Sequence, residues 1–357
     1  MFKSIEYYKP DYKRVIERYK ELYQAEGSGN HLAYAMPPIT PPERMPALNK
    51  VDFENGLEDY LDLTLRNYAA QLEEIREIPD DLLPSAGLFF GIGDYSAFIA
   101  GDVVFTADTS WAAPVIEKWE DLDRLTLDPE NVWVKRLERT TRHIVKRTID
   151  SPIPIVRGYY SPLDMAHALR GEKLFTDFFD EPEQVSRLMQ FATDAVIWMA
   201  RRLQPIIGLT WGGNVAGAWL PPGSVCMSED IACMISPRTY AKFARPYTQQ
   251  VIDAFGHGQI HTHSLGLKNI PEIAKLINLM SIQISDDPNT PRAFEQLEFL
   301  LPRCDGMPLT VGCTLEEVRR DITKLQDLGN IIFAGFVPDV ATGKELVSLV
   351  RRHSRIQ

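Results

Sequence analysis

The sequence has few cysteines, no cluster of basic residues and no long apolar run. Its four cysteines, Cys226, Cys233, Cys304 and Cys313, form neither a CxxC pair nor a zinc-ribbon spacing. We therefore expect free thiols in a reducing cytoplasm rather than disulfide bonds. No run of 18 apolar residues and no apolar leader segment occurs, so we expect neither a membrane span nor a secretory signal.

Positive charge is also scarce. The 357 residues hold 38 Lys and Arg against 49 Asp and Glu, a formal net charge of -11, and the basic residues are scattered. This distribution argues against nucleic acid as the main partner. The glycines at Gly91-Ile92-Gly93-Asp94 lack the third glycine of a dinucleotide fingerprint, so NAD binding is not expected. The overall composition, 45% hydrophobic and 24% charged, is that of a globular protein.

Short apolar runs alternate with helical patterns along the chain. The runs cover residues 32–36, 88–90, 153–156, 206–211, 259–263, 279–284, 309–312 and 331–335. Eight strands joined by helical crossovers predict an α/β fold, the (β/α)8 TIM barrel. An open sheet of seven or eight strands is the alternative.

The barrel pattern does not account for every segment. Residues 1–30 are predicted to form an N-terminal helical extension, and residues 31–357 the barrel domain. Residues 105–128 fit no barrel repeat and are interpreted as an insertion between the second and third strands. Residues 37–46 contain five prolines and are expected to form a loop.

The predicted fifth strand ends in two histidines. His261 and His263 are two positions apart, so they project to the same side of a strand. Cys313 follows the predicted seventh strand, and the carboxyl ends of barrel strands share one mouth. Because imidazole and thiolate bind zinc, we predict a metal site of His261, His263 and Cys313, completed by an acid or water. Alternatively, Cys313 is a small buried residue and the histidines bind substrate by hydrogen bonds.

Acidic and aromatic residues follow other predicted strands. Glu229 and Asp230 precede a predicted helix and are candidates for catalysis together with His261, although acids in a first helical turn also stabilise the helix. The residues predicted to bind substrate at the barrel mouth are Arg157, Tyr159, Tyr160, Trp211, Asp286 and Asp287. Packing in the barrel rim or core is the alternative for these positions.

The order of several motifs resembles a known family. The motifs read PVIEKWEDLDRL, DPENVWVKRL, IPIVRGYYSPLDMAHALRG, LFTDFFDEPEQVSRLM, SEDIACMISPRTYAKFARPYTQQVI and QIHTHS. Together they resemble the uroporphyrinogen decarboxylase (URO-D) superfamily over residues 115–350. The resemblance implies a (β/α)8 barrel. It also implies either the haem-pathway decarboxylase activity or methyl transfer linked to cobalamin or another corrinoid.

The resemblance is nearer to the methyltransferase branch. The decarboxylase carries an arginine-rich signature after the first strand, whereas this sequence has LAYAMPPITPPERMPALNK there. The methyltransferase branch resembles a zinc enzyme, with His-x-Cys on the fifth strand and a second Cys near the eighth. His261 matches the family histidine, but His263 replaces the first cysteine and Phe336 lies near the position of the second.

Three functions are compatible with these features. The first is a methyltransferase that uses zinc and a corrinoid (cobalamin) supplied by a partner protein. The second is a decarboxylase of uroporphyrinogen or another small polycarboxylate, as in porphyrin biosynthesis, and the third is a non-catalytic ligand-binding barrel. The expected partners are a small-molecule substrate and, by the resemblance, a corrinoid protein, with a homodimer left open.

Overall fold

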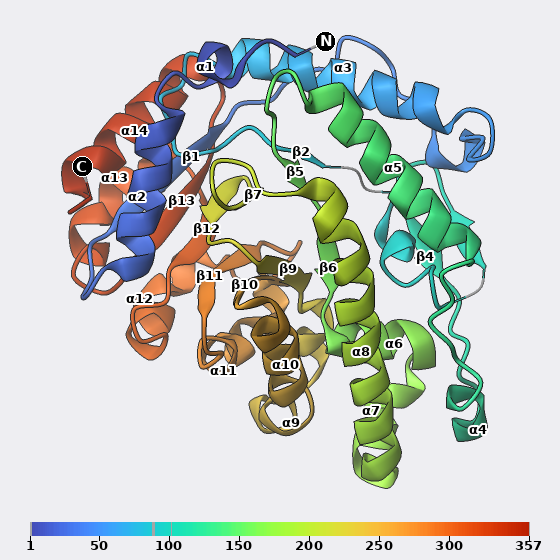
Figure 1. Cartoon of the computed structure of the whole chain (residues 1–357). Helices are drawn as coiled ribbons and strands as arrows, with labels where there is room; N and C mark the ends of the chain where they lie inside the picture. The colour runs from blue at the N-terminus through green and yellow to red at the C-terminus, as the bar shows by residue number, and fades with distance from the viewer. Residues whose placement is uncertain (1, 88–89, 101, 357) are drawn as a thin grey trace.

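A curved parallel sheet forms the centre of the molecule (Figure 1). The computed structural model describes residues 2–87, 90–100 and 102–356. Seven strands are hydrogen-bonded in the order β1-β13-β12-β11-β10-β9-β6. Their bounds are β1 His31–Met36, β6 Gly158–Tyr160, β9 Ser224–Ser228, β10 His257–His263, β11 Leu279–Ser285, β12 Leu309–Cys313 and β13 Ile331–Phe336.

A short parallel pair continues this sheet. β2 (Ala86–Gly87) pairs with β5 (Ile155–Val156), which only Arg157 separates from β6. The strands therefore follow one another in the order expected of a (β/α)8 barrel, as the sequence predicts. Among the described residues, no ladder of hydrogen bonds joins β1 to β2. The predicted strand at 88–90 is not placed as such, because residues 88 and 89 lie outside the described part of the chain.

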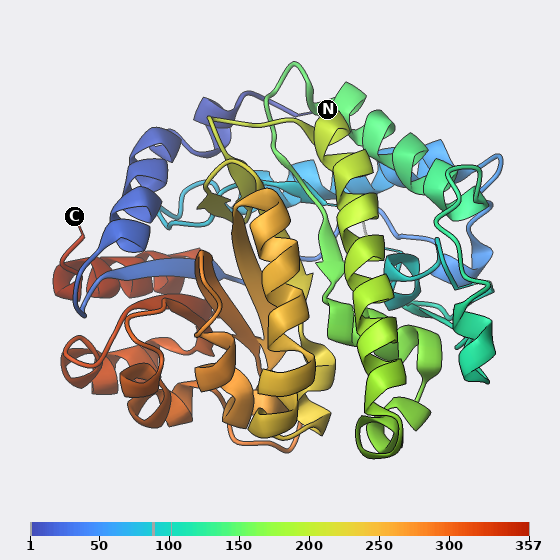
Figure 2. The same cartoon turned by 60° about the horizontal axis from the view of Figure 1, so that its bottom comes forward.

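Helices surround the outer side of the sheet, as Figure 2 shows from a second direction. The longer helices are α2 Tyr12–Gln24, α3 Leu57–Ile75, α5 Val132–Thr148, α6 Pro162–Arg170, α7 Lys173–Asp180, α8 Pro182–Ile207, α10 Arg245–Phe255, α13 Leu315–Leu325 and α14 Val340–His353. The shorter ones are α1 Ile5–Tyr8, α4 Trp119–Leu122, α9 Pro237–Phe243, α11 Ile270–Ile273 and α12 Leu297–Leu300. Local sequence sets several starts: Ser236 caps α9 by accepting a hydrogen bond from the Thr239 amide, with Pro237 next in the chain.

One predicted strand is wrong. Ile206 and Ile207 complete the last turn of α8, which ends at Gly208 with a φ of 72°. The fourth barrel strand is instead β9, preceded by the hairpin β7 (Asn214–Ala216) and β8 (Ala218–Leu220). The apolar run at 206–211 continues the helical periodicity of α8. The sequence of β9, SVCMS, is too short and polar to be recognised as a strand.

The segment between β2 and β5 departs from the barrel repeat, as the sequence predicts. β3 (Val103–Phe105) and β4 (Ser110–Ala112) form an antiparallel hairpin, and α4 follows it. The hairpin is fixed to the barrel because the Ser110 hydroxyl donates to the Phe90 carbonyl at 2.6 Å. The inserted hairpin therefore covers one side of the mouth.

The two sides of the sheet are packed differently. One face of each strand contacts the helices through residues such as Ile260, Ile282 and Val311. On the inner face of β1 and β13, apolar residues pack against α2 and the β7–β8 hairpin. Leu32 and Ile332 contribute to this second cluster, which fills the end of the barrel where the strands begin. The opposite end, where strands finish, remains available for a site.

Two buried carboxylates lie between β1 and β2, where no strand ladder is described. Asp81 Oδ2 accepts from the Ala33 amide at 2.9 Å, and Asp80 Oδ2 accepts from the Ala35 amide at 3.1 Å. Burial raises the pKa of both acids, and positive charges oppose the rise. Lys9 Nζ lies 2.6 Å from Asp80 Oδ1. These side chains thus provide the hydrogen bonds that a neighbouring strand would otherwise give to β1.

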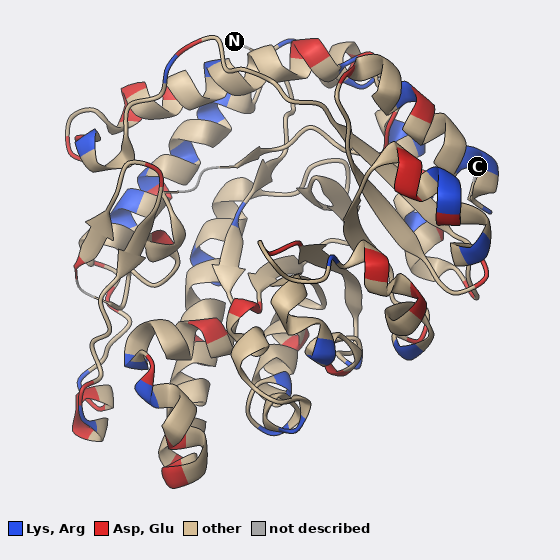
Figure 3. Cartoon of the chain, turned by 180° about the vertical axis from the view of Figure 1, so that it is seen from behind, with Lys and Arg blue, Asp and Glu red and all other residues tan. Residues whose placement is uncertain are grey.

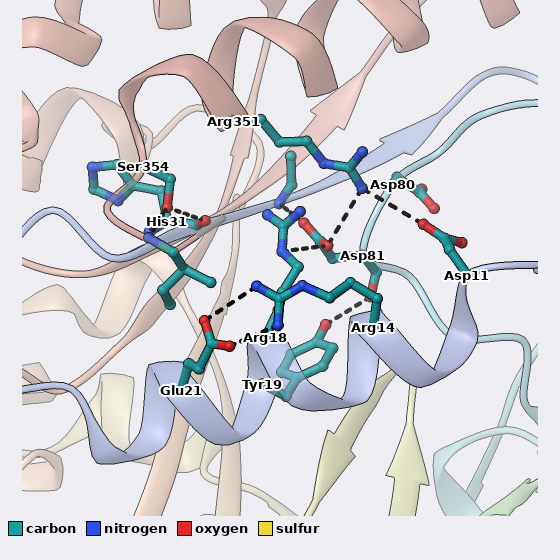
Figure 4. Close-up of polar contacts among 12 residues, drawn as sticks. Asp11, Arg14, Arg18, Tyr19, Glu21, His31, Asp80, Asp81, Arg351 and Ser354 are labelled. Atoms are coloured by element: carbon teal, nitrogen blue, oxygen red, sulfur yellow. Dashed lines mark hydrogen bonds and ion pairs between the residues drawn. The ribbon is translucent and has the colours of Figure 1, made fainter.

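The same acids connect the two ends of the chain (Figure 4). Arg18 Nε, from α2, lies 3.3 Å from Asp81 Oδ1, and Arg351 of α14 lies 3.9 Å from the same oxygen. The Tyr19 hydroxyl donates to the Asp81 carbonyl at 3.0 Å. Helices from the beginning and the end of the sequence are therefore held at one seam.

Charge on the outside is mixed. Figure 3 shows Lys and Arg interspersed with Asp and Glu on the outer helices rather than gathered on one element. On α5, for example, Arg136 pairs with Glu54 and Arg139 pairs with Glu58. In the described part of the chain, no helix combines the length and apolar character needed to cross a bilayer.

We expect Asp81→Asn to lower the free energy of unfolding by about 3 kcal/mol, because it leaves the buried Arg18 guanidinium without its counter-charge. The amide oxygen of Asn retains an acceptor for the Ala33 amide, so the change tests charge rather than shape. Asp11→Asn is the matched control. Asp11 also pairs with Arg351, at 3.8 Å, but it is solvent-accessible, and its loss should cost less than about 1 kcal/mol. Urea unfolding measures both, and equal effects would contradict this account.

Candidate metal centre

Two histidines face each other at the end of β10. His261 and His263 occupy alternate positions on the inner side of the strand, so their rings project into the barrel mouth. Their Nε2 atoms are 3.3 Å apart, and the ring planes meet at 84°. The sequence prediction that both histidines point to one place is consistent with this geometry.

Asp230 completes a triangle of ligand atoms. Its Oδ1 lies 3.6 Å from His261 Nε2 and 3.7 Å from His263 Nε2. This oxygen is buried and accepts no hydrogen bond from the described residues. Burial raises the pKa of Asp230, while the two imidazoles oppose the rise. Zinc bonds of about 2.0–2.1 Å in a tetrahedral arrangement place ligand atoms about 3.3 Å apart, close to the spacings seen here.

The other ring nitrogens have acceptors that orient both imidazoles. His263 Nδ1 lies 2.9 Å from Asp287 Oδ1, and His261 Nδ1 hydrogen-bonds to Gln283 Oε1. A carboxylate and an amide oxygen only accept, so each Nδ1 carries a proton, and in the neutral imidazole Nε2 then presents a lone pair. Two lone pairs at 3.3 Å repel unless a cation or proton lies between them. The arrangement therefore suits a metal ion.

Asp164 of α6 positions the third ligand. Its Oδ2 accepts from the Asp230 amide at 3.0 Å and from the Ser228 hydroxyl at 2.7 Å, and its Oδ1 accepts from the Ile231 amide at 2.9 Å. Burial and the neighbouring Asp230 and Glu229 raise the pKa of Asp164 well above its usual range. Asp164 thus fixes the turn after β9 and adds to the local excess of acidic groups.

A cavity of about 310 Å³ adjoins the histidine pair inside the barrel. Its lining includes His261, Gln283, Asp230, Tyr160, Cys226 and Thr310. A second cavity of about 380 Å³, under the β3–β4 hairpin, shares Asp230, Tyr160 and Ile92 with the first. A small molecule in either cavity would lie beside the proposed ligands.

The structure does not bring the predicted Cys313 to this site. Cys313 is fully buried and packs in the hydrophobic core between sheet and helices. Because strand residues alternate, Thr310 and Gly312 of β12 face the barrel interior while Cys313 faces outward. Burial also raises the pKa of the Cys313 thiol, which disfavours the thiolate needed for zinc. The third group beside the two histidines is the Asp230 carboxylate, which follows β9 and not β12.

Glu229 is also outside the site, although it was a candidate for catalysis. Its side chain is fully buried on the helix side, where Oε1 accepts from the Thr248 hydroxyl at 2.6 Å and the Tyr240 hydroxyl at 3.1 Å. Burial raises the pKa of Glu229 to about 7, against the effect of these hydrogen bonds. Glu229 therefore packs behind the mouth, whereas its neighbour Asp230 points into it.

The residues predicted to bind substrate divide into two groups. Tyr160 lines both cavities, and Asp287 holds His263. Asp286 instead accepts hydrogen bonds from Arg292 Nε at 3.0 Å and the Ala293 amide at 2.8 Å, so it closes its own loop. Trp211 lies before β9 begins, with its ring 5.0 Å from that of Tyr12, at the end of the barrel away from the mouth.

Arg157 does not line the cavity, and Tyr159 contributes to its lining although its ring packs in the core. The Arg157 guanidinium lies 2.6 Å from Asp94 Oδ1 and stacks on Tyr95, and both charged side chains are buried. The Tyr159 ring is buried in the core that faces the helices. Sequence reasoning missed Asp94, which neutralises Arg157, and Gln283, which orients His261. On β11, the polar residues Gln283 and Ser285 alternate with apolar ones. This pattern could have predicted that Gln283 faces the interior of the barrel.

The high pKa of Glu229 has a measurable consequence. Between about pH 4.5 and 7 the folded protein keeps a proton that the unfolded chain has released, so this group makes folding less favourable as pH rises. We expect Glu229→Gln to gain stability relative to the wild type across this window, by a few kcal/mol at most. Thermal unfolding at pH 5 and pH 8 measures the difference. The exposed Glu26→Gln is the control, and a pH-independent effect of Glu229→Gln would contradict the assignment.

Comparison with known proteins gives the family. Residues 87–291 match the model described as uroporphyrinogen decarboxylase (URO-D), which covers more than half of the chain. A solved methyltransferase from Methanosarcina mazei has a similar fold, with a TM-score of 0.60 and 12% identity over 95% of this chain and 98% of that chain. No curated protein matches the sequence. The chain is a member of the URO-D family.

Proposed function

We propose that this protein is a metal-dependent methyltransferase that moves a methyl group between a corrinoid on a partner protein and a small acceptor or donor. The observation that carries the proposal is the cluster of His261 Nε2, His263 Nε2 and Asp230 Oδ1, separated by 3.3–3.7 Å. The likeness in fold to a solved methyltransferase supports the same branch of the family.

The residues fit a zinc ion. Two neutral imidazoles and one carboxylate are accepted zinc ligands, and three protein ligands leave a fourth position open, as in catalytic zinc sites. Asp230 Oδ1 is buried without a hydrogen-bond donor, which a cation would satisfy. His263 takes the place of the first cysteine of the family pattern, and Asp230 supplies the third ligand in place of the second cysteine.

Each part of the chain has a role in this proposal. When bound, zinc lowers the pKa of a thiol and so makes it a better nucleophile. Gln283 and Asp287 hold the imidazoles in the tautomer that leaves Nε2 free, and Asp164 holds the turn that carries Asp230. The adjoining cavity positions the small molecule and excludes bulk water.

The cavity is poorly suited to uroporphyrinogen, which carries eight carboxylates. None of the described residues that line it is Lys or Arg. Arg157, the closest predicted cation, is already paired with Asp94. Carboxylates need cationic or hydrogen-bond donors when they leave water. Decarboxylation of a polycarboxylate is therefore the weaker candidate.

We expect protein purified without chelators to contain up to one zinc per chain. His261→Ala and Asp230→Asn should each lower the zinc content at least about tenfold, because each removes one of three ligands. Cys313→Ala is the control and should retain the metal, since Cys313 packs in the core. Elemental analysis decides the question. Retention of zinc in His261→Ala, or its loss only in Cys313→Ala, would contradict the site.

We expect the zinc-loaded protein to demethylate a methylated corrinoid when a thiol is added, and to form no coproporphyrinogen from uroporphyrinogen under anaerobic conditions. The first reaction is followed by the visible spectrum of the corrinoid, and the second by chromatography of the oxidised products. His261→Ala should abolish demethylation. Turnover of uroporphyrinogen above about 0.1 per second, near the usual range of enzymes, would favour the decarboxylase instead.

A further inference from the structure

The cavity continues inward from the histidine pair along one level of the barrel. The strand register places Tyr160 beside Ser228, Ser228 beside His261, and His261 beside Gln283. Gln283 is in turn opposite Thr310 of β12. Neighbouring parallel strands are about 4.8 Å apart. Thr310 of β12 is two strands away from His261 of β10, so the two residues lie about 10 Å apart along the barrel wall. A ligand held at His261 would extend toward Thr310.

The charged groups around this cavity leave no positive charge for an anionic ligand. The lining carries one carboxylate, Asp230, and in the described chain it includes no Lys or Arg. The ion pair between Arg157 and Asp94, at 2.6 Å, has no charge to spare. Asp230 and one bound thiolate would already balance one divalent cation, and Asp287 adds a further negative charge beside His263. A second negative group on the ligand would have no counter-charge.

Most polar side chains in the cavity already have partners. Gln259 bonds to Ser281 at 3.2 Å and to Cys226 at 3.5 Å, and Gln283 Nε2 donates to Ser285 at 3.1 Å. The exceptions are Asp230 Oδ1 and the hydroxyls of Tyr159 and Thr310. The Tyr159 ring packs in the core that faces the helices, so the inward hydroxyl without a partner is that of Thr310. Its side chain is only 4% exposed, and its Oγ1 has no hydrogen-bond partner among the described residues. A buried hydroxyl of this kind calls for a polar group on the ligand.

We propose that the small methyl acceptor is an uncharged thiol that carries a hydroxyl or amide group, held at its far end by Thr310. This inference rests on the proposed function, because it needs the metal at Asp230, His261 and His263. It adds the substrate class: the cavity selects against thiols that bear a carboxylate, sulfonate or phosphate.

The test uses cobalt(II) in place of zinc, because the visible spectrum of cobalt reports thiol binding independently of turnover. The intact protein is titrated with 2-mercaptoethanol and 3-mercapto-1-propanol, and with their anionic counterparts 2-mercaptoethanesulfonate and 3-mercaptopropionate. We expect the uncharged thiols to bind at least about tenfold more tightly. Equal or tighter binding of the anionic thiols would overturn the inference.

Variants separate the role of Thr310 from general packing. Thr310→Val keeps the shape and should weaken the best hydroxylated thiol about five- to tenfold, while 1-propanethiol binds as before. Thr140→Val is the matched control, because Thr140 is also buried with an unpartnered hydroxyl but lies on α5. An equal effect of Thr310→Val on both thiols would contradict the hydrogen bond. Failure to bind cobalt would overturn the proposed function as well, whereas normal cobalt binding with a preference for anions overturns this inference alone.

Discussion

The buried pair Asp80 and Asp81 is the interaction on which the barrel depends. A parallel barrel needs every strand to find hydrogen bonds on both edges, and β1 has a strand partner on only one described edge, β13. The two carboxylates accept the β1 amides on the other edge. Because Lys9, Arg18 and Arg351 surround them, the helices at both ends of the chain also depend on this seam.

The candidate site depends on a second set of acids, at the opposite end of the barrel. Asp164 and Asp287 do not belong to the triangle of ligand atoms, yet each fixes one of its members by hydrogen bonds. Burial, and after it the neighbouring acids, raise the pKa of Asp164 and of Asp230, and a divalent cation would relieve the repulsion between the carboxylates. In the proposed site, the same excess of acids that would favour a metal would disfavour anionic molecules in the adjoining cavity.

Much of the barrel was predictable from sequence because strands such as β10, β11 and β13 are apolar runs between helical patterns. The fourth strand was not, because the inward residues Cys226 and Ser228 of β9 face a cavity rather than a packed core. The histidine pair followed from its two-residue spacing. The outward direction of Cys313 did not, because all five residues of β12 are buried and Thr310 is the one polar side chain of the strand that marks its inner side.

Contacts between residues far apart in the sequence could not be predicted either. Asp94 neutralises Arg157 from a 3-10 helix (Ile92–Tyr95) that is far from Arg157 in the sequence. No local sequence pattern predicts this ion pair. Glu229 and Asp230 are adjacent, yet one points toward the helices and the other into the mouth. Alternation along an extended chain allows for this difference, but only the packing of Tyr240 and Thr248 determines which acid is buried.

The hydrogen bond between Asp287 and His263 limits which side chains position 263 can carry. In the methyltransferase pattern that the sequence resembles, a cysteine stands at the position of His263. A cysteine there offers no ring nitrogen to Asp287 Oδ1, whose other oxygen accepts from the Leu265 amide. The acid would then stand as an uncompensated negative charge beside an anionic thiolate. An exchange of His263 for cysteine would therefore need a second change at Asp287, which is not one of the proposed metal ligands.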